Sequence, residues 1–171
     1  DPLFLTRKYG TDALRMTLVV GNTPGTDLAL REEKIKRYKN FANKIWNIAR
    51  FVLSQERDGK LDKEPVDEFN ALVKDVTRDM ENYRFHIAAE KIYAYVWHRF
   101  ADEIIEEAKK QPGRGETLYY ILENSLKLLH PFMPFITEEI WSSFAKATDG
   151  QASLLMIEPW FTPSKVEGPS I

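Results

Sequence analysis

Apolar residues recur at intervals of three and four positions along most of this 171-residue chain, which is the spacing that gathers side chains on one side of an α-helix. Such patterns cover residues 30–55, 66–82, 85–110, 116–130 and 137–147. Clusters that contain Gly or Pro separate these segments except at 83–84, because both residues interrupt a regular helix. The pattern therefore predicts an all-α protein, an antiparallel helical bundle with short connections.

Each predicted helix has a stripe of apolar positions that we expect to face the core. In chain order the stripes hold Tyr38, Phe41, Ile45, Ile48, Ala49 and Val52; Phe69, Leu72, Val73 and Val76; Phe85, Ala89, Ile92, Val96, Phe100 and Ile104; Leu118, Ile121, Leu122, Leu126 and Leu129; and Ile140, Trp141 and Phe144. Pro65 predicts that residues 58–65 form a loop, and Tyr83 with Arg84 predicts a short break. Thr137 is expected to cap the last helix.

The two ends of the chain show weaker patterns. Leu14, Leu18 and Val19 suit a short helix or strand that opens near Thr11 as its N-cap. The cluster of Gly, Pro and polar residues at 21–27 predicts a loop and a boundary. Residues 148–171 hold five Gly and Pro residues, which predict an irregular tail with at most one short extended piece at 154–157. We therefore divide the chain into residues 1–30, a helical domain at 31–147 and a tail at 148–171.

The net charge of −2 conceals an uneven distribution. Residues 1–60 hold 12 Lys and Arg against 7 Asp and Glu, whereas residues 61–171 hold 12 against 19. The basic excess lies within residues 31–50, which hold seven basic and two acidic residues. Such a cluster can steer a polyanion to one face, although a solvated helix face is the simpler interpretation of charge alone.

A second stripe on the first long helix lies about 100–120° around the axis from the core stripe. It holds Arg37, Asn40, Lys44, Asn47 and Phe51. Such a combination suits an unstacked RNA base, because an aromatic ring stacks on the base for about 1–3 kcal/mol, Lys meets phosphate and Asn reads a base edge. The alternative is that Phe51 packs under the 58–65 loop or against a neighbouring helix.

No set of side chains in the sequence forms a self-sufficient active site, so we expect no catalytic residue and no cofactor in this chain. Cysteine is absent, which excludes thiolate chemistry. His98 and Asp102 have a metal-ligand spacing, but no second histidine joins them, and we expect no metal. Glu103, Glu106 and Glu107 fit a solvated face better than acid–base chemistry. No apolar run approaches the roughly 18 residues of a membrane span, and we expect no membrane contact and a cytoplasmic location.

Four blocks of the sequence resemble the valine–tRNA ligases, a family of class I aminoacyl-tRNA synthetases. They are YGTDALR at 9–15, PGTD at 24–27, NFANKIWN at 40–47 with ARF at 49–51, and LLHPFMPFITEEIW at 128–141. The first and last blocks also occur loosely in the relatives for leucine and isoleucine, whereas the third is more specific to the valine enzymes. The resemblance extends over residues 1–145.

The resemblance implies an α-helical anticodon-binding domain at 31–147, preceded by the end of the catalytic and stem-contact region at 1–30. The family's KMSKS and HIGH motifs are absent. It therefore implies a piece of an enzyme that uses ATP, magnesium and valine, whose catalytic and editing domains are further parts of the same chain. The implied partner is the anticodon stem-loop of valine tRNA. The chain departs from the family at 103–105, where relatives often have two aromatic residues, and in the tail.

Within the resemblance, Lys44 and Phe51 match the family's anticodon contacts. The expected tRNA-binding residues are Lys44, Phe51, Asn40, Asn47, Arg37, Lys34, Lys39 and Arg50. Three alternatives stay open: the same module of a leucine or isoleucine tRNA ligase, a helical protein-interaction bundle whose basic face meets an acidic partner, and an enzyme with a helical active site. Exchange of the anticodon separates the first alternative from the valine assignment, and indifference to anticodon sequence indicates the second.

Overall fold

The computed structural model describes residues 1–21, 25, 30–147 and 153–161, and in these residues it contains helices and no β-strand. The helices are α1 (Pro2–Tyr9), α2 (Thr11–Val19), α3 (Glu32–Leu53), α4 (Lys63–Glu81), α5 (Phe85–Ala94), the π-helix η1 (Tyr95–Ile104), α6 (Ile105–Ala108), α7 (Gly115–Leu129), α8 (Pro134–Ala147) and the 3-10 helix η2 (Leu155–Ile157). The predicted all-α bundle is thereby confirmed. None of the described helices is both long enough and apolar enough to cross a membrane.

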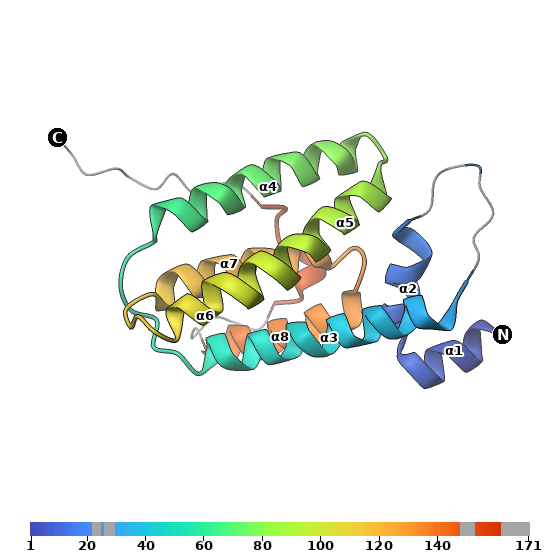
Figure 1. Ribbon diagram of the computed structural model, residues 1–171, viewed down its shortest axis with the longest axis horizontal. Helices are drawn as coiled ribbons and strands as arrows, with labels where there is room; N and C mark the ends of the chain where they lie inside the picture. The colour runs from blue at the N-terminus through green and yellow to red at the C-terminus, as the bar shows by residue number, and fades with distance from the viewer. Residues whose placement is uncertain (22–24, 26–29, 148–152, 162–171) are drawn as a thin grey trace.

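Helix α7 is the centre of the bundle (Figure 1), because it contacts α3, α4, α5 and α8. In the view of Figure 1, α4 lies above it and α3 lies below it. All five of its predicted core positions are buried, and so are Asn124 and Ser125. A helix that buries polar as well as apolar side chains is surrounded by neighbours, which is the position that α7 occupies.

Helix α3 forms the edge of the bundle that carries the predicted binding stripe. Its six predicted core positions are all buried, which confirms the apolar pattern. Phe41 connects α3 to the neighbouring helix, because its ring centroid lies 4.8 Å from that of Tyr93 and 6.1 Å from that of Trp97.

The third predicted helix is one continuous run in which the π-helix η1 separates α5 from α6. Its predicted core positions from Ala89 to Ile104 are buried, but Phe85 is 41% exposed, contrary to the prediction. Phe85 is the first residue of α5, and its ring meets that of Tyr83 at the turn instead of the core. The π segment was not predicted, and such segments often occur at functional sites.

The connections differ from the prediction in detail. Pro65 does not end a loop but lies in the first turn of α4, where its missing N–H costs no helical hydrogen bond. Tyr83 makes the predicted break between α4 and α5, with a φ of 58°. Most of the predicted loop at 21–27 lies outside the described residues.

The first thirty residues contribute helices that pack on the bundle. Helix α1 was not predicted; it begins at a proline and the Asp1 carboxylate caps it. Helix α2 covers the segment expected to be helix or strand, with Gly10 rather than Thr11 as its N-cap. It contacts α3 and α8, and its side chains Leu14 and Met16 belong to the same core as the rest of the bundle.

Two further predictions near the C-terminal end are wrong. Thr137 does not cap α8, because the helix already begins at Pro134 and the Thr137 hydroxyl donates to the carbonyl of Met133. Proline fits the first turn of a helix, so the helix starts one turn earlier than predicted. The segment expected to be extended is the 3-10 helix η2, whose residue Leu155 is buried and donates its N–H to Glu138.

Candidate nucleic-acid interface

The predicted stripe on α3 is present on one side of the helix. Arg37, Asn40 and Asn47 are exposed, whereas Lys44 and Phe51 are half-buried. The half-buried pair lies where α3 approaches η1 and α6, and the exposed residues continue along the helix on either side of Lys44. The stripe is therefore neither wholly solvated nor buried.

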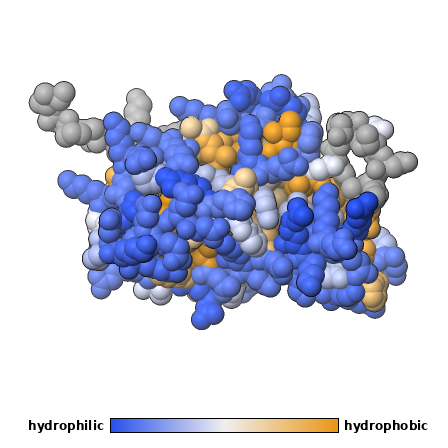
Figure 2. Space-filling view, viewed as in Figure 1, coloured by the Kyte–Doolittle hydropathy of each residue, from blue (hydrophilic) through white to orange (hydrophobic). Residues whose placement is uncertain are grey.

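Lys44, Asn47 and Phe51 share one hollow between α3 and the η1–α6 run, of about 200 Å³. We call it the α3–η1 groove; it is lined by Lys44, Asn47, Ile48, Phe51, Ala101, Asp102, Ile105, Glu106 and Lys109. Both of its walls lie on the face seen in Figure 2, where hydrophilic side chains predominate and apolar ones show between them. An apolar floor with charged rims suits a flat, polar-edged ligand such as an unstacked base.

Lys44 stands at one end of the groove with two partners from η1. Its Nζ lies 2.6 Å from Oδ1 of Asp102 and 4.5 Å from the centre of the Trp97 ring. The ammonium is thus engaged in an ion pair and a cation–π contact within the protein.

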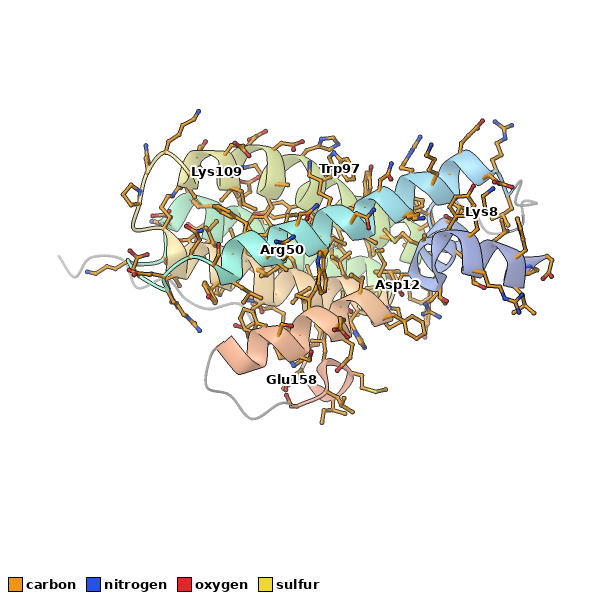
Figure 3. All side chains as sticks on the ribbon, turned by 90° about the horizontal axis from the view of Figure 1, so that it is seen from below. Lys8, Asp12, Arg50, Trp97, Lys109 and Glu158 are labelled. Carbon is orange, nitrogen blue, oxygen red and sulfur yellow. The ribbon has the colours of Figure 1, made fainter. Side chains whose placement is uncertain are left out.

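Phe51 stands at the other end, beneath Lys109. The Lys109 Nζ lies 5.4 Å from the centre of the Phe51 ring and 2.6 Å from Oε1 of Glu106. Phe51 also packs against the hydrophobic core without being buried. The packing alternative is thus confirmed in part, because one portion of the ring packs on the core, and another portion remains accessible at the groove. In Figure 3, Lys109 and Trp97 project from the run that lies alongside α3.

The remaining predicted residues point elsewhere. Arg50 is exposed and lines a different hollow, of about 310 Å³, which Trp46 shares on α3 and Ile140 on α8. Lys39 donates a hydrogen bond to the carbonyl of Lys8, 3.2 Å away, at the α1 end of α3. Neither residue reaches the α3–η1 groove.

Lys34 has a structural contact. Its Nζ donates to the carbonyl oxygen of Val20 at the end of α2. Burial lowers the pKa of Lys34 from its ordinary value of 10.5, and the nearby Arg37 acts in the same direction while Glu90 opposes it. The ammonium of Lys34 is therefore already used to hold α2 against α3.

The other groups considered for chemistry are mostly ion-paired. Glu103 pairs with Arg99 at 2.7 Å, and Glu107 pairs with Arg114 at 3.1 Å. His98 Nδ1 lies 3.8 Å from Oδ2 of Asp102. Among the described residues, no group of three or more His, Cys, Asp or Glu side chains is placed to hold a metal ion.

Three residues of the site were not predicted as parts of it: Trp97, Asp102 and Lys109. Asp102 was considered only as a metal ligand beside His98. The ion pair of Lys44 with Asp102 could not be predicted from local spacing of opposite charges, because these residues are 58 positions apart in the chain. Residues 102–107 hold four acidic residues and no basic one, which is the signal that this segment presents carboxylates to a basic neighbour.

A sequence-family model described as the anticodon-binding domain of tRNA ligase matches residues 62–170. The chain is 37% identical over 166 residues to the valine–tRNA ligase of Solibacter usitatus (strain Ellin6076), which covers 92% of this chain and 19% of that protein. It is 40% identical over 163 residues to the valine–tRNA ligase of Bacillus thuringiensis subsp. konkukian (strain 97-27), which covers 82% of this chain and 18% of that protein. The chain thus spans about a fifth of the length of the curated relatives it matches.

The fold is similar to that of a chain in the crystal structure of the ternary complex of Agrobacterium radiobacter K84 agnB2 LeuRS, tRNA and LeuAMS. The TM-score is 0.75 at 22% sequence identity, over 95% of this chain and 21% of that chain. The family match begins at residue 62 and so leaves out α3, whereas the alignment with the Solibacter usitatus protein takes in 92% of the chain.

Proposed function

Because the chain belongs to the family of anticodon-binding domains of tRNA ligases, we propose that it recognises the anticodon stem-loop of valine tRNA. The assignment to valine is supported by relatives named valine–tRNA ligase at 37–40% identity. In a parent enzyme of this kind, ATP, magnesium and valine serve the catalytic domain, and an editing domain belongs to the same chain. The part played by these 171 residues is recognition.

The observation that carries this proposal is the α3–η1 groove, which brings Phe51, Asn47 and Lys44 into one hollow of about 200 Å³. An unstacked anticodon base placed there stacks on Phe51, and its edge meets the amide of Asn47 and the ammonium of Lys44. The exposed Arg37 and Asn40 continue the stripe beyond the groove, where the ribose–phosphate backbone of the loop runs. Recognition then combines base contacts in the groove with backbone contacts outside it.

The charged residues outside the groove have graded roles in this proposal. Arg37 contributes a phosphate contact near the groove, while Lys39 and Arg50 contribute contacts at the flanks of α3. Lys34 contributes least, because the carbonyl of Val20 already accepts its ammonium. We assign residues 31–147 to anticodon binding and residues 1–30 to the contact with the tRNA stem.

The experiment is a titration of the chain with four RNA stem-loops at two salt concentrations. The loops are that of valine tRNA, the same loop with its anticodon replaced, and those of leucine and isoleucine tRNA. We expect the valine loop to bind more tightly than the other three at both salt concentrations, because salt weakens the phosphate contacts of all loops alike.

Two outcomes would favour the alternatives. Tighter binding of the leucine or isoleucine loop assigns the module to that ligase. Equal binding of all four loops, reduced by salt, indicates a generic basic face such as that of a protein-interaction bundle.

A further inference from the structure

The ammonium of Lys44 is held from two sides by η1. Asp102 Oδ1 lies 2.6 Å from its Nζ, and the Trp97 ring centre lies 4.5 Å away. The Lys44 side chain is 25% exposed, whereas that of Asp102 is 50% exposed. The carboxylate therefore remains accessible to a ligand in the groove while it neutralises the cation.

The π-helical form of η1 makes this double contact possible. Trp97 and Asp102 are five residues apart, and in an α-helix residues at this separation point about 140° away from each other. In a π-helix each N–H bonds to the carbonyl five residues earlier, so residues five apart lie close to the same side. The irregular backbone thus places both residues on one lysine.

The other charged groups near Asp102 complete the pattern. His98 Nδ1 is 3.8 Å from Oδ2 of Asp102, and Glu106, one turn further along, pairs with Lys109 at 2.6 Å. Each of the two cations that line the groove, Lys44 and Lys109, therefore has its own carboxylate. The groove presents neighbouring donors and acceptors rather than a field of positive charge.

We propose that Asp102 is a specificity-determining residue of this groove, because it keeps Lys44 as its counter-ion and makes the groove select a base edge over a phosphate. This inference rests on the proposed anticodon binding. A phosphodiester has only acceptor oxygens, so it reaches Lys44 only by placing a second anion beside the Asp102 carboxylate. The edge of an unpaired base carries a donor next to an acceptor, and it can satisfy Asp102 and Lys44 together.

The test is a double-mutant cycle in the 171-residue chain, titrated with the valine stem-loop and with the same loop carrying a replaced anticodon. The variants are Asp102→Asn, Lys44→Gln and the two combined. Glu103→Gln is the matched control, because it removes the same charge from the same helix. Glu103 pairs with Arg99 rather than with a groove residue. Circular dichroism confirms that each variant is folded, and Asp102→Ser serves as a second substitution.

We expect Asp102→Asn to raise the affinity for the replaced loop by about two- to fivefold, the range that corresponds to loss of an exposed ion pair. The dependence of log affinity on log salt should steepen by about 0.7 to 0.9, as for one added phosphate contact. The ratio of affinities for the native and replaced loops should fall. In the Lys44→Gln background, Asp102→Asn should have no more effect than Glu103→Gln.

The inference is overturned if Asp102→Asn and Glu103→Gln have equal effects, or if the gain from Asp102→Asn persists without Lys44. Either result, with a wild-type chain that still prefers the native loop, leaves the proposed function intact. A wild-type chain that does not distinguish the two loops overturns the proposed function and this inference together.

Discussion

The Oδ2 atom of Asp12 accepts a hydrogen bond from the backbone N–H of Ile136, 2.7 Å away and 124 positions along the chain. Its Oδ1 atom accepts another from the N–H of Phe135 at 3.2 Å. These N–H groups belong to the first turn of α8, where no preceding helical carbonyl is available. Asp12 therefore caps α8 from a distance and ties the first thirty residues to the bundle.

Two substitutions of Asp12 should distinguish the contribution of its hydrogen bonds to stability from that of its charge. Asp12→Ala is expected to lower the free energy of unfolding by about 0.5–2 kcal/mol, the usual loss for an N-cap. Asp12→Asn should cost less, since its amide oxygen still accepts a hydrogen bond. Urea denaturation of both variants at pH 7 measures the difference, and equal losses would show that the carboxylate charge rather than the cap matters.

The same residue predicts a pH effect. Burial raises the pKa of the Asp12 carboxyl from its ordinary value of 3.8, while the two backbone N–H groups act in the opposite direction. A raised folded pKa gives stability that is present below the unfolded pKa and is lost as the pH rises through the folded pKa. The stability of wild type relative to Asp12→Asn should thus fall as the pH rises from 3.8 through the raised folded pKa, as measured by urea titrations at several pH values.

Asp79 predicts a pH effect of the opposite sign. Its carboxylate is buried and lies 2.7 Å from Lys91 Nζ and 2.5 Å from Arg84 Nη2. The pKa of Asp79 is lowered from its ordinary value of 3.8, and the hydrogen bond from Lys91 is the largest cause. Asp79→Asn should lower the free energy of unfolding by about 1.5–3 kcal/mol at pH 7, as expected for hydrogen bonds to a charged group.

The deficit of Asp79→Asn should shrink as the pH falls below 3.8 and through the depressed folded pKa, because the wild-type carboxylate is then protonated as well. Glu106→Gln is the control, since Glu106 is half exposed, its pair with Lys109 is a surface contact, and neither residue touches Asp79 or Lys91. Its effect should stay within about 0.5 kcal/mol. A deficit of Asp79→Asn that does not change with pH contradicts the ionic explanation.

Lys34 and Arg37 lie on the same helix but should respond differently in RNA binding. Arg37→Gln removes an exposed guanidinium and should reduce the slope of log affinity against log salt by about 0.7 to 0.9. Lys34→Gln should leave that slope unchanged and lower thermal stability instead, because Lys34 bonds to Val20. Salt titrations of both variants, with thermal unfolding alongside, provide the comparison; a reduced slope for Lys34→Gln would refute the structural role.

The fold of this protein is largely predictable from its sequence because local apolar spacing is repeated over whole helices. The predicted core positions of α3, from Tyr38 to Val52, and those of α7 show this most clearly, since all of them are buried. The predictions fail where a residue distant in the chain, or the backbone conformation, determines the local structure. Asp12 replaces Thr137 as the cap of α8, and no local pattern can reveal a partner 124 positions away.

The candidate site was predictable only on the α3 side. Lys44, Asn47 and Phe51 were identified because they share one face of one helix, a relation that sequence spacing determines. Trp97, Asp102 and Lys109 were not, because their approach to α3 depends on helix packing and on the π-helical turn of η1. The apolar positions from Val96 to Ile104 are spaced four apart, which also fits a regular α-helix. The sequence pattern therefore does not distinguish the π-helix from an α-helix.

In the proposed function Phe51 carries base recognition, and a binding titration of wild type and Phe51→Leu with the native and anticodon-replaced valine stem-loops tests this role. Leu keeps the apolar packing of Phe51 but offers no ring for stacking, and Phe51→Ala runs alongside. We predict that wild type prefers the native loop. Phe51→Leu should bind that loop about 1–3 kcal/mol more weakly and lose most of the preference for it over the replaced loop. Preference retained in Phe51→Leu, or equal weak binding of both loops by wild type, would contradict this prediction.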